Sequence, residues 1–377
     1  MSVVYKKLED VCEILDSRRV PITAKDRKAG TYPYYGANGL QDYVADYIFD
    51  DELVLLAEDG GNFGSKERPI AYRVSGKCWV NNHAHVLKAK PNMHVDYLCY
   101  ALMFYDTEGL VNGATRQKLT QAAMRQMVIP YRDMTEQLQI IKKISQIVRS
   151  IEKRKEELQL LDQLVKSRFI ELFGDPLSND KGWKKVVIAE VCHAIFGGGT
   201  PSKSHPEYFA GSIPWVSPKD MKSSVINDSI DHITEEAIAH STTNLVPANS
   251  VLMVIRSGIL KHSLPVAINS LPVTINQDMK AFVPNETVKT AFLMHFFKAI
   301  ETDVLAGVRG VTADNIDFKA FQKRTIIVPP LALQEQFAAF VEQTDKSKYY
   351  SSLSFRYCQA AANTYRQEWM TCRTSDF

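Results

Sequence analysis

The longest regular pattern of apolar positions lies in the middle of the chain, over residues 134–174. Residues 135–173 contain no glycine and no proline, and apolar residues recur there at steps of three and four, as in a helix that packs along one seam. Gly174 and Pro176 follow, an arrangement that ends a helix cleanly. We expect a rod roughly 50 Å long, at about 1.5 Å per residue, with a more polar middle. Its expected seam residues are Ile141, Ile144, Val148, Ile151, Leu158, Val165 and Leu172.

A second helix is expected close to the C-terminus, within residues 332–377. It places Phe337 and Phe340 on one side, where they can pack against the first helix. Serines become frequent further on, and the segment 353–357 alternates between apolar and polar residues instead of following a period of 3.6. The sequence therefore predicts that the tail of the chain, from residue 349 onward, does not copy the first helix.

Two stretches with shorter patterns, residues 1–133 and 175–331, flank the first helix. Their apolar runs are short and are bounded by glycine, proline and asparagine, as in strands and turns. One segment, 95–105, has helical spacing. We therefore expect two mixed domains of helix and sheet with many short elements. The expected strands are 52–57, 84–90 and 128–130 in the first stretch, and 251–255 and 325–328 in the second.

The two stretches resemble each other, which indicates a duplication. The offset between matching segments increases along the chain, so the second copy carries insertions. Solenoid repeats recur about every 20–50 residues, whereas this period spans a whole domain and its helix. Two similar folded units predict two similar tasks. The matching segments are 5–7 with 183–185, 78–82 with 273–277, 113–115 with 310–312, 129–130 with 328–330, and Glu136-Gln137 with Glu335-Gln336.

Composition is that of an ordinary globular protein. The 377 residues, 45% apolar and 23% charged, suffice for two or three domains with their own cores. The net charge of +2 is too small to require a polyanionic partner, although local basic patches remain compatible with it. The six cysteines form no C-x-x-C pair, which argues against a disulfide framework or a zinc cluster. Apolar runs fall short of the ~18 residues of a membrane span, so we expect a cytoplasmic location and no membrane partner.

Several motifs suggest chemistry but have simpler interpretations. The run of glycines in 197–201 lacks the spacing of a phosphate-binding loop and is expected to be a flexible turn. The loop 30–39, rich in tyrosine and glycine, is expected to be a packed turn rather than a surface that stacks on bases. His83 and His85 could bind a metal, but the second copy does not repeat them, so no metal site is expected. Neither a nucleophile elbow nor a Walker motif occurs, which lowers the chance that the chain itself catalyses a reaction.

Polar and basic residues beside the turns of both copies are the candidates for contact with nucleic acid. Asparagine and glutamine can bond adenine edges bidentately if they face DNA, and lysine and arginine can hold phosphates. For any single basic residue, an ordinary solvated position is the simpler interpretation. The candidates are Lys66, Arg68, Asn81, Asn82, His83, Arg116, Lys118, Lys219, Arg256, Lys261, Asn276 and Gln277.

This layout resembles the specificity subunits of Type I restriction–modification systems. The resemblance rests on the two junctions at 128–137 and 328–336 and on the segments 80–86 and 275–280, and it covers residues 1–348. It implies an α+β fold with two similar globular target-recognition domains, separated by the family's conserved long helices, which pack as an antiparallel coiled coil. The implied parts are a first target-recognition domain at 1–133, the central conserved helix at 134–174, a second target-recognition domain at 175–331, and a C-terminal conserved helix with an atypical tail at 332–377.

The same resemblance implies a subunit that reads DNA and has no active site of its own. Each domain would read one half of a split target in double-stranded DNA. Modification (methyltransferase) subunits, which bind S-adenosylmethionine, and restriction (translocase and nuclease) subunits, which use ATP and Mg, would join it, so no cofactor is expected in this chain. Because the tail departs from the family's pattern, we expect a weakened or asymmetric assembly.

Two other interpretations stay open at this point. The chain could be the detached recognition part of a fused methyltransferase–nuclease, in which case methyl transfer by the chain alone is expected. It could instead be a coiled-coil adaptor that binds only proteins. The sequence does not predict the DNA target, because base choice depends on three or four side chains per domain.

Overall fold

The computed structural model describes most of the chain, with side chains as far as residue 365. Parts of the sequence-based predictions lie outside the described residues: 114–115 and 310–312 of the repeated segments, and the end of the expected tail. The described residues are 4–113, 116–308 and 314–370.

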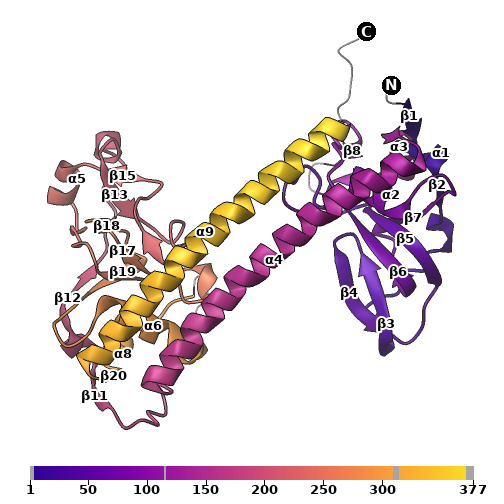
Figure 1. The fold of residues 1–377 in the computed structure, drawn as a ribbon. Helices are drawn as coiled ribbons and strands as arrows, with labels where there is room; N and C mark the ends of the chain where they lie inside the picture. Colours follow the sequence, from indigo (N-terminus) through magenta and orange to yellow (C-terminus); the bar gives the residue numbers. More distant parts are fainter. Residues whose placement is uncertain (1–3, 114–115, 309–313, 371–377) are drawn as a thin grey trace. The chain divides into compact units, whose positions relative to one another are not determined.

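The chain divides into two compact units. Unit 1 comprises residues 1–155 and 353–377, and unit 2 comprises residues 156–352. Two long helices, α4 (Met134–Phe173) and α9 (Leu331–Met370), each contribute one segment to each unit (Figure 1). The domain boundaries expected from the sequence treat the long helices as separate parts, whereas each compact unit includes a segment of both helices. Those boundaries stay a prediction.

Unit 1 is built on a six-stranded sheet in the order β2-β7-β5-β6-β3-β4. Its neighbouring strands are antiparallel except β3 and β6, which run parallel. A separate antiparallel pair, β1 and β10, joins the two ends of the domain sequence. The strands are β1 (Val4–Lys7), β2 (Cys12–Ile14), β3 (Ala29–Gly36), β4 (Gly39–Val44), β5 (Phe49–Ala57), β6 (Ala71–Val80), β7 (Ala84–Ala89), β8 (Val111–Asn112), β9 (Lys118–Leu119) and β10 (Val128–Tyr131), and the short helices are α1 (Leu8–Val11), α2 (Val95–Leu102) and α3 (Gln121–Gln126).

The central strand β5 explains why its sequence is a continuous apolar run. Val54 and Leu56 pack on the side of the sheet that α2 covers, whereas Leu53 and Leu55 pack on the opposite side, and all four are 0% exposed. A strand buried on both faces has no polar side to show, so alternation disappears. This strand therefore forms the middle of the unit 1 core.

Unit 2 repeats the design with a five-stranded sheet in the order β12-β19-β16-β17-β14 and a three-stranded sheet in the order β15-β13-β18. The antiparallel pair β11 and β20 matches β1 and β10. The strands are β11 (Lys184–Val187), β12 (Cys192–Gly197), β13 (Ile213–Val216), β14 (Val225–Ile226), β15 (His232–Ile233), β16 (Val251–Val254), β17 (Val266–Asn269), β18 (Thr274–Ile275), β19 (Met279–Pro284) and β20 (Thr325–Val328), and the short helices are α5 (Glu235–Ala239), α6 (Thr290–Ala299), α7 (Glu301–Ala306) and α8 (Phe318–Phe321).

An aromatic cluster fastens both long helices to the unit 2 domain. The Phe169 and Phe173 rings of α4 lie 5.7 and 4.9 Å from the Phe292 ring of α6. The same two rings lie 5.5 and 5.4 Å from the Phe337 ring of α9. Each such aromatic pair adds about 0.5–1.5 kcal/mol beyond the area it buries. The predicted packing position of Phe337 is therefore inside the core, and Phe340 lies half-buried beside it.

A buried glutamine occupies the same place at the start of each long helix. In unit 1, Gln137 Oε1 accepts a bond of 2.8 Å from the His94 N–H, and its Nε2 donates to the Arg132 carbonyl at 2.8 Å. In unit 2, Gln334 makes the corresponding bonds, both 2.8 Å, with the Lys289 N–H and the Pro329 carbonyl.

Gln137 therefore corresponds to Gln334, and both side chains are 0% exposed. The sequence comparison had paired Gln137 with Gln336, and this pairing is wrong by two residues. Gln336 is exposed. The repeated Glu-Gln dipeptide suggests a wrong pairing because the duplication preserves the hydrogen bonds of one buried glutamine and not the dipeptide sequence.

Helix α9 corrects a second prediction. It begins at Leu331 and runs through residues 349–357 without a break, although the sequence pattern weakens there. In unit 2, Lys348 Nζ lies 2.8 Å from Asp162 Oδ1 of α4, and in unit 1, Lys143 Nζ of α4 lies 5.5 Å from the Tyr365 ring centre. Packing against another helix outweighs a weak local pattern.

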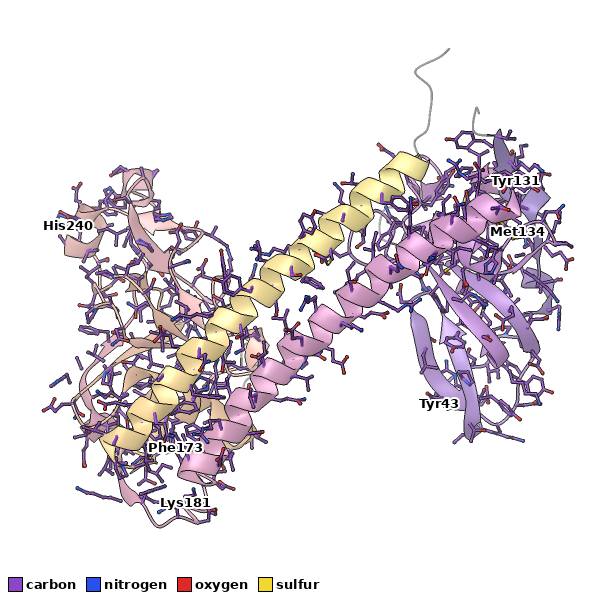
Figure 2. The ribbon with its side chains drawn as sticks, viewed as in Figure 1. Tyr43, Tyr131, Met134, Phe173, Lys181 and His240 are labelled. Atoms are coloured by element: carbon purple, nitrogen blue, oxygen red, sulfur yellow. The ribbon has the colours of Figure 1, made fainter. Side chains whose placement is uncertain are left out.

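In unit 2 the two helices run antiparallel. Asp162 of α4 meets Lys348 of α9, and Phe169, further along α4, meets Phe337, which lies earlier on α9. Figure 2 marks Met134 and Phe173, the first and last residues of α4, which are the predicted limits to within a residue. The expected α+β class, with two similar domains and two long helices, is confirmed. Within the described residues, every helix is too short or too polar to cross a membrane.

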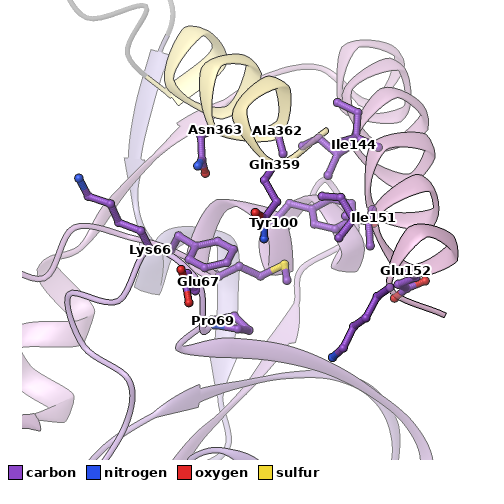
Figure 3. A pocket seen from close by; sticks show the side chains of 15 residues that line it. Lys66, Glu67, Pro69, Tyr100, Ile144, Ile151, Glu152, Gln359, Ala362 and Asn363 are labelled. Carbon is purple, nitrogen blue, oxygen red and sulfur yellow. The ribbon is translucent and has the colours of Figure 1, made fainter. Parts of the chain in front are cut away.

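The predicted seam residues of α4 lie at different depths. Val165 is 2% exposed in the unit 2 core. The other six are half-buried, and in unit 1 three of them, Ile144, Val148 and Ile151, line a cavity of about 470 Å³ that α2 and α9 complete (Figure 3). Their role in binding partner subunits stays a prediction. The six are Ile141, Ile144, Val148, Ile151, Leu158 and Leu172.

Candidate nucleic-acid interface

The same asparagine turn ends a parallel strand in each unit. Asn81 follows β6, and its N–H donates to the Tyr35 carbonyl at 3.0 Å; Asn276 follows β18, and its N–H donates to Val216 at 2.9 Å. In both turns the side-chain oxygen accepts a backbone N–H two residues on, from His83 at 2.8 Å and from Asp278 at 3.1 Å. Asparagine favours this turn because its short side chain replaces a backbone acceptor.

Asn81 and Asn276 are therefore poor candidates for contact with bases. They are only 3% and 7% exposed, and their amide nitrogens already donate to Gln41 and Asp278, respectively. The next residue in each turn, Asn82 or Gln277, is exposed. The duplication thus presents one exposed amide side chain at the same point of both domains.

Three groups from distant segments meet above the turn in unit 1. Asp59 Oδ1 lies 2.7 Å from His83 Nδ1 and accepts a hydrogen bond of 2.6 Å from Arg116 Nη2. The Arg116 side chain remains 60% exposed, against 18% for Asp59. The carboxylate therefore fixes the direction of a guanidinium group whose other side faces solvent.

Arg116 also borders a hollow of about 580 Å³, together with Asn82 and His83. On another wall, the Arg27 guanidinium lies over the Tyr34 ring at 4.2 Å, a cation–π contact. The hollow has donors, acceptors and an aromatic face, which are the groups that bind nucleic acids. Its remaining lining residues are Pro21, Ile22, Thr23, Gln41 and Asn81.

The other candidates of unit 1 are not gathered in this hollow. Lys118 Nζ lies 3.1 Å from Glu58 Oε1. Burial raises the pKa of Glu58, but hydrogen bonds from Arg19 and Lys118 outweigh it, so the net pKa lies below its usual value. Lys66 borders the cavity beside α4, and Arg68 borders a separate hollow of about 530 Å³.

In unit 2 the acid and the basic side chain beside the turn occupy each other's positions. The Glu58 N–H donates to His83 O at 2.8 Å, and the Ile255 N–H donates to Asp278 O at 2.8 Å. These bonds place Arg256 where unit 1 has Asp59, and Asp278 where unit 1 has His83.

Arg256 Nε donates to Asp278 Oδ1 at 2.6 Å, and the arginine side chain is 48% exposed. Both units therefore present an arginine that a single carboxylate holds beside the asparagine turn. Lys261 lies 3.9 Å from Asp314, and Lys219 is exposed on the loop after β13.

The glycine run of unit 2 is tightly packed, so the expected flexible turn is wrong. The Gly199 N–H donates to the Ile275 carbonyl at 3.0 Å. A Cβ atom on Gly198 would overlap the carbonyl oxygen of Asn276, and one on Gly199 would overlap Thr242. The glycines let this segment lie directly against the asparagine turn, and Thr200 at its end donates a hydrogen bond to Gln277.

Unit 1 also contains a cluster of acidic and histidine side chains that no sequence motif marks. Ligand-type atoms of Asp16, Glu58 and His85 lie within 4.8 Å of one another. Arg19 Nη1 lies 2.6 Å from Glu58 Oε2, and His85 Nε2 faces the Leu119 carbonyl at 2.9 Å, where it can only donate. Protein donors and a cation thus already occupy the cluster, which fits a buried ion network better than a metal site.

Together the fold and the site define a class: a tandem pair of α+β domains, each with a held arginine and an exposed amide beside one turn, and two long helices that each contribute a segment to both units. The family model for the Type I restriction modification DNA specificity domain matches residues 2–161 and 180–349. The chain therefore belongs to this family, and it carries the domain twice.

Named relatives agree with this membership. The chain is 34% identical over 307 residues to the EcoR124I/EcoR124II specificity subunit of Escherichia coli, covering 79% of this chain and 72% of the relative. A specificity subunit of Haemophilus influenzae, S.HindORF215P, is 37% identical over 140 residues, 37% of this chain and 36% of its own length. The crystal structure of the Type I restriction–modification S subunit from M. genitalium matches 98% of this chain and 96% of its own with a TM-score of 0.61 and 13% identity, which supports the fold.

Proposed function

We propose that this chain is the DNA-recognition subunit of a Type I restriction–modification complex, in which each domain reads one half of a bipartite target. The observation that carries the proposal is the repeated turn, which presents an exposed amide, Asn82 or Gln277, and a held arginine at the same point of two domains of this family. Two copies of one reader suit a target with two halves.

The proposed contacts fall into two groups. Asn82, Gln277, Arg116 and Arg256 stand beside the turns and are suited to base edges. Other solvent-exposed cations are suited to phosphates, which set the register of a protein on DNA without reading sequence. The second group is Lys66, Arg68 and Lys219, whereas Lys118 and Lys261 each lie near a carboxylate.

Catalysis is proposed to belong to partner subunits. Modification subunits would bring S-adenosylmethionine, and restriction subunits would bring ATP and Mg, while this chain selects the site in the cytoplasm. The carboxylates beside the turns support this division, because Asp59 and Asp278 are each engaged with an arginine.

The test is to express the chain with modification subunits of its own system and to map the methylated positions in the host genome. The proposal expects one split sequence with two specified halves and a fixed unspecified gap. Methyl transfer by the purified chain alone would favour the fused-enzyme alternative. A failure to shift random DNA at low salt, with and without partners, would favour the adaptor.

A further inference from the structure

We propose that Arg116 and Arg256 are base-reading residues, each selecting a guanine in its own half of the target, and that Asp59 and Asp278 are positioning residues that hold them. This inference rests on the proposed function and adds to it the side chains and the base. The two arginines lie on different segments, one before β9 and the other after β16. Their common feature is the carboxylate contact rather than a shared sequence motif.

The geometry leaves part of each guanidinium available. Arg256 uses Nε to donate to Asp278, and Arg116 uses Nη2 to donate to Asp59. A guanidinium carries five N–H donors in a rigid plane, so one contact orients the group and leaves further donors. Two parallel donors match the O6 and N7 acceptors of guanine in the major groove, which is the commonest specific contact between a side chain and a base.

The charge of each pair also favours a base over a phosphate. A carboxylate at 2.6 Å cancels much of the positive potential that a phosphate would feel, and it repels the phosphate itself. A guanine edge carries no net charge, so it is not repelled in this way. Pairing with an acid therefore weakens an arginine as a phosphate clamp while improving it as an oriented reader.

The carboxylates are themselves held, as positioning requires. Asp278 receives the Asn276 amide at 3.3 Å on its second oxygen. Asp59 lies against His83 as well as Arg116. The asparagine turn, the acid and the arginine thus form one connected arrangement in each unit, although acid and base have exchanged positions between the copies.

The experiment uses the full chain in complex with its modification subunits and a DNA library randomised at both halves of the mapped target. For Arg256→Lys, which keeps the charge but loses the planar fork, we expect about a tenfold or greater loss of preference for guanine at one position of one half. The other half should keep its preference. Asp278→Asn should relax the same position, and it should strengthen binding to non-specific DNA because it removes a negative charge beside Arg256.

A matched control exists in the same unit. Arg324 pairs with Asp303, which is not part of the turn or of its arginine–carboxylate pair, and Arg324→Lys should leave every base preference unchanged. Arg116→Lys repeats the test in the other half, with Arg73→Lys, from the Arg73–Asp96 pair of unit 1, as its control. Melting curves of all variants identify any change that acts through unfolding, and the two arginines provide independent tests.

Three results would overturn the inference while leaving the proposed function intact. One is a mapped target with no guanine in either half. The second is that Arg256→Lys weakens binding to all DNA sequences equally. The third is that it reduces the salt dependence of DNA binding. Both would indicate a phosphate contact. Absence of any preferred sequence for the wild-type complex would instead refute the proposed function and the inference with it.

Discussion

The two units share one backbone framework but fill one corner of it in opposite ways. In unit 1, Asp16, Glu58 and His85 form a buried ion network, with His85 Nδ1 2.6 Å from Asp16 Oδ2. Strand register places His85 opposite Leu56 and its counterpart, Lys280, opposite Met253. The duplication therefore kept the strands while replacing a whole group of polar side chains.

Unit 2 shows what replaces the network. Lys280 lies over the Phe318 ring at 5.0 Å, and Ile255 stands where unit 1 has Glu58. Gly197 faces Lys280 across the strand pair, and a Cβ atom there would lie 2.9 Å from the lysine Nζ. The corner is thus built from a cation over an aromatic ring and a glycine that leaves it room.

This contrast shows that backbone hydrogen bonds, and not side-chain chemistry, define the framework. The asparagine turn and the buried glutamine persist because they satisfy backbone groups that otherwise have no partner. Side chains that satisfy each other can change together. The exchanged acid and base around Arg116 and Arg256 follow the same rule.

The largest effect is expected from Asp16→Ala. The change leaves His85 and the Val86 N–H, now 2.9 Å from Asp16 Oδ1, without their acceptor in a buried site. Breaking one partner of a buried ion pair costs about 3–5 kcal/mol. Hydrogen exchange of the full chain should show lost protection in β7 of unit 1 and unchanged protection in β19 of unit 2.

A surface pair of the same type provides the control. Asp228 lies 2.8 Å from His232 with most of its side chain in solvent, and Asp228→Ala should cost no more than about 1 kcal/mol. Equal losses for the two variants would show that the unit 1 network is not a buried ion network.

The next effect is expected from the glutamines. Gln334→Leu removes the acceptor of the Lys289 N–H and the donor to the Pro329 carbonyl, and it should destabilise unit 2 by about 2–3 kcal/mol. Gln137→Leu should do the same in unit 1. Urea unfolding followed by hydrogen exchange would separate the units. Gln336→Leu is the matched control, and a comparable loss there would restore the pairing that the sequence suggested.

A somewhat smaller loss is expected from Gly198→Ala, because the new methyl group overlaps the Asn276 carbonyl and overpacking costs about 1–3 kcal/mol. Thermal unfolding of the full chain is the measurement. Gly258→Ala, where a Cβ atom meets nothing within 4 Å, should change the melting temperature little. Full stability of Gly198→Ala would contradict the close packing of this segment.

The smallest effect concerns acid. Burial raises the pKa of Asp16, but the hydrogen bond and charge of His85 and the bond from Val86 outweigh it, so its net pKa is lowered; the pKa of Glu58 is lowered as well. A lowered folded-state pKa adds stability that is complete above the unfolded value, about 4, and is lost as pH falls through the folded value. Unit 2 has Gly197 and Ile255 at these positions. As the pH is lowered from about 5 to about 2, hydrogen exchange should therefore detect opening of unit 1 before opening of unit 2. Earlier opening of unit 2 would contradict the comparison.

Local patterns predicted the elements whose signals lie within a few neighbouring residues. The limits of α4 follow from an apolar seam without glycine or proline and from Gly174, whose φ is 74°. The strand β20 lies where an apolar run meets two prolines. The second long helix was underestimated because its stability comes from α4, which sequence periodicity does not include.

The candidate site divides in the same way. Residue type identified Arg116, Arg256 and the amides of both turns as polar groups at strand ends. It did not distinguish the buried Asn81 from the exposed Asn82, because both follow the strand and only the turn geometry decides which one faces inward. It also gave no sign of Asp16, which meets His85 from a segment 69 positions away.

The sequence by itself determined that this protein is a duplicated pair of domains with long helices, since apolar spacing and repeated segments depend only on neighbouring residues. Only the tertiary structure decided which side chains share a site and which glutamines correspond, and it revealed that the arginines of both units are held by acids. The physical reason is that hydrogen bonds and ion pairs depend on distances of about 3 Å between groups from distant segments, and those distances exist only once the strands are paired.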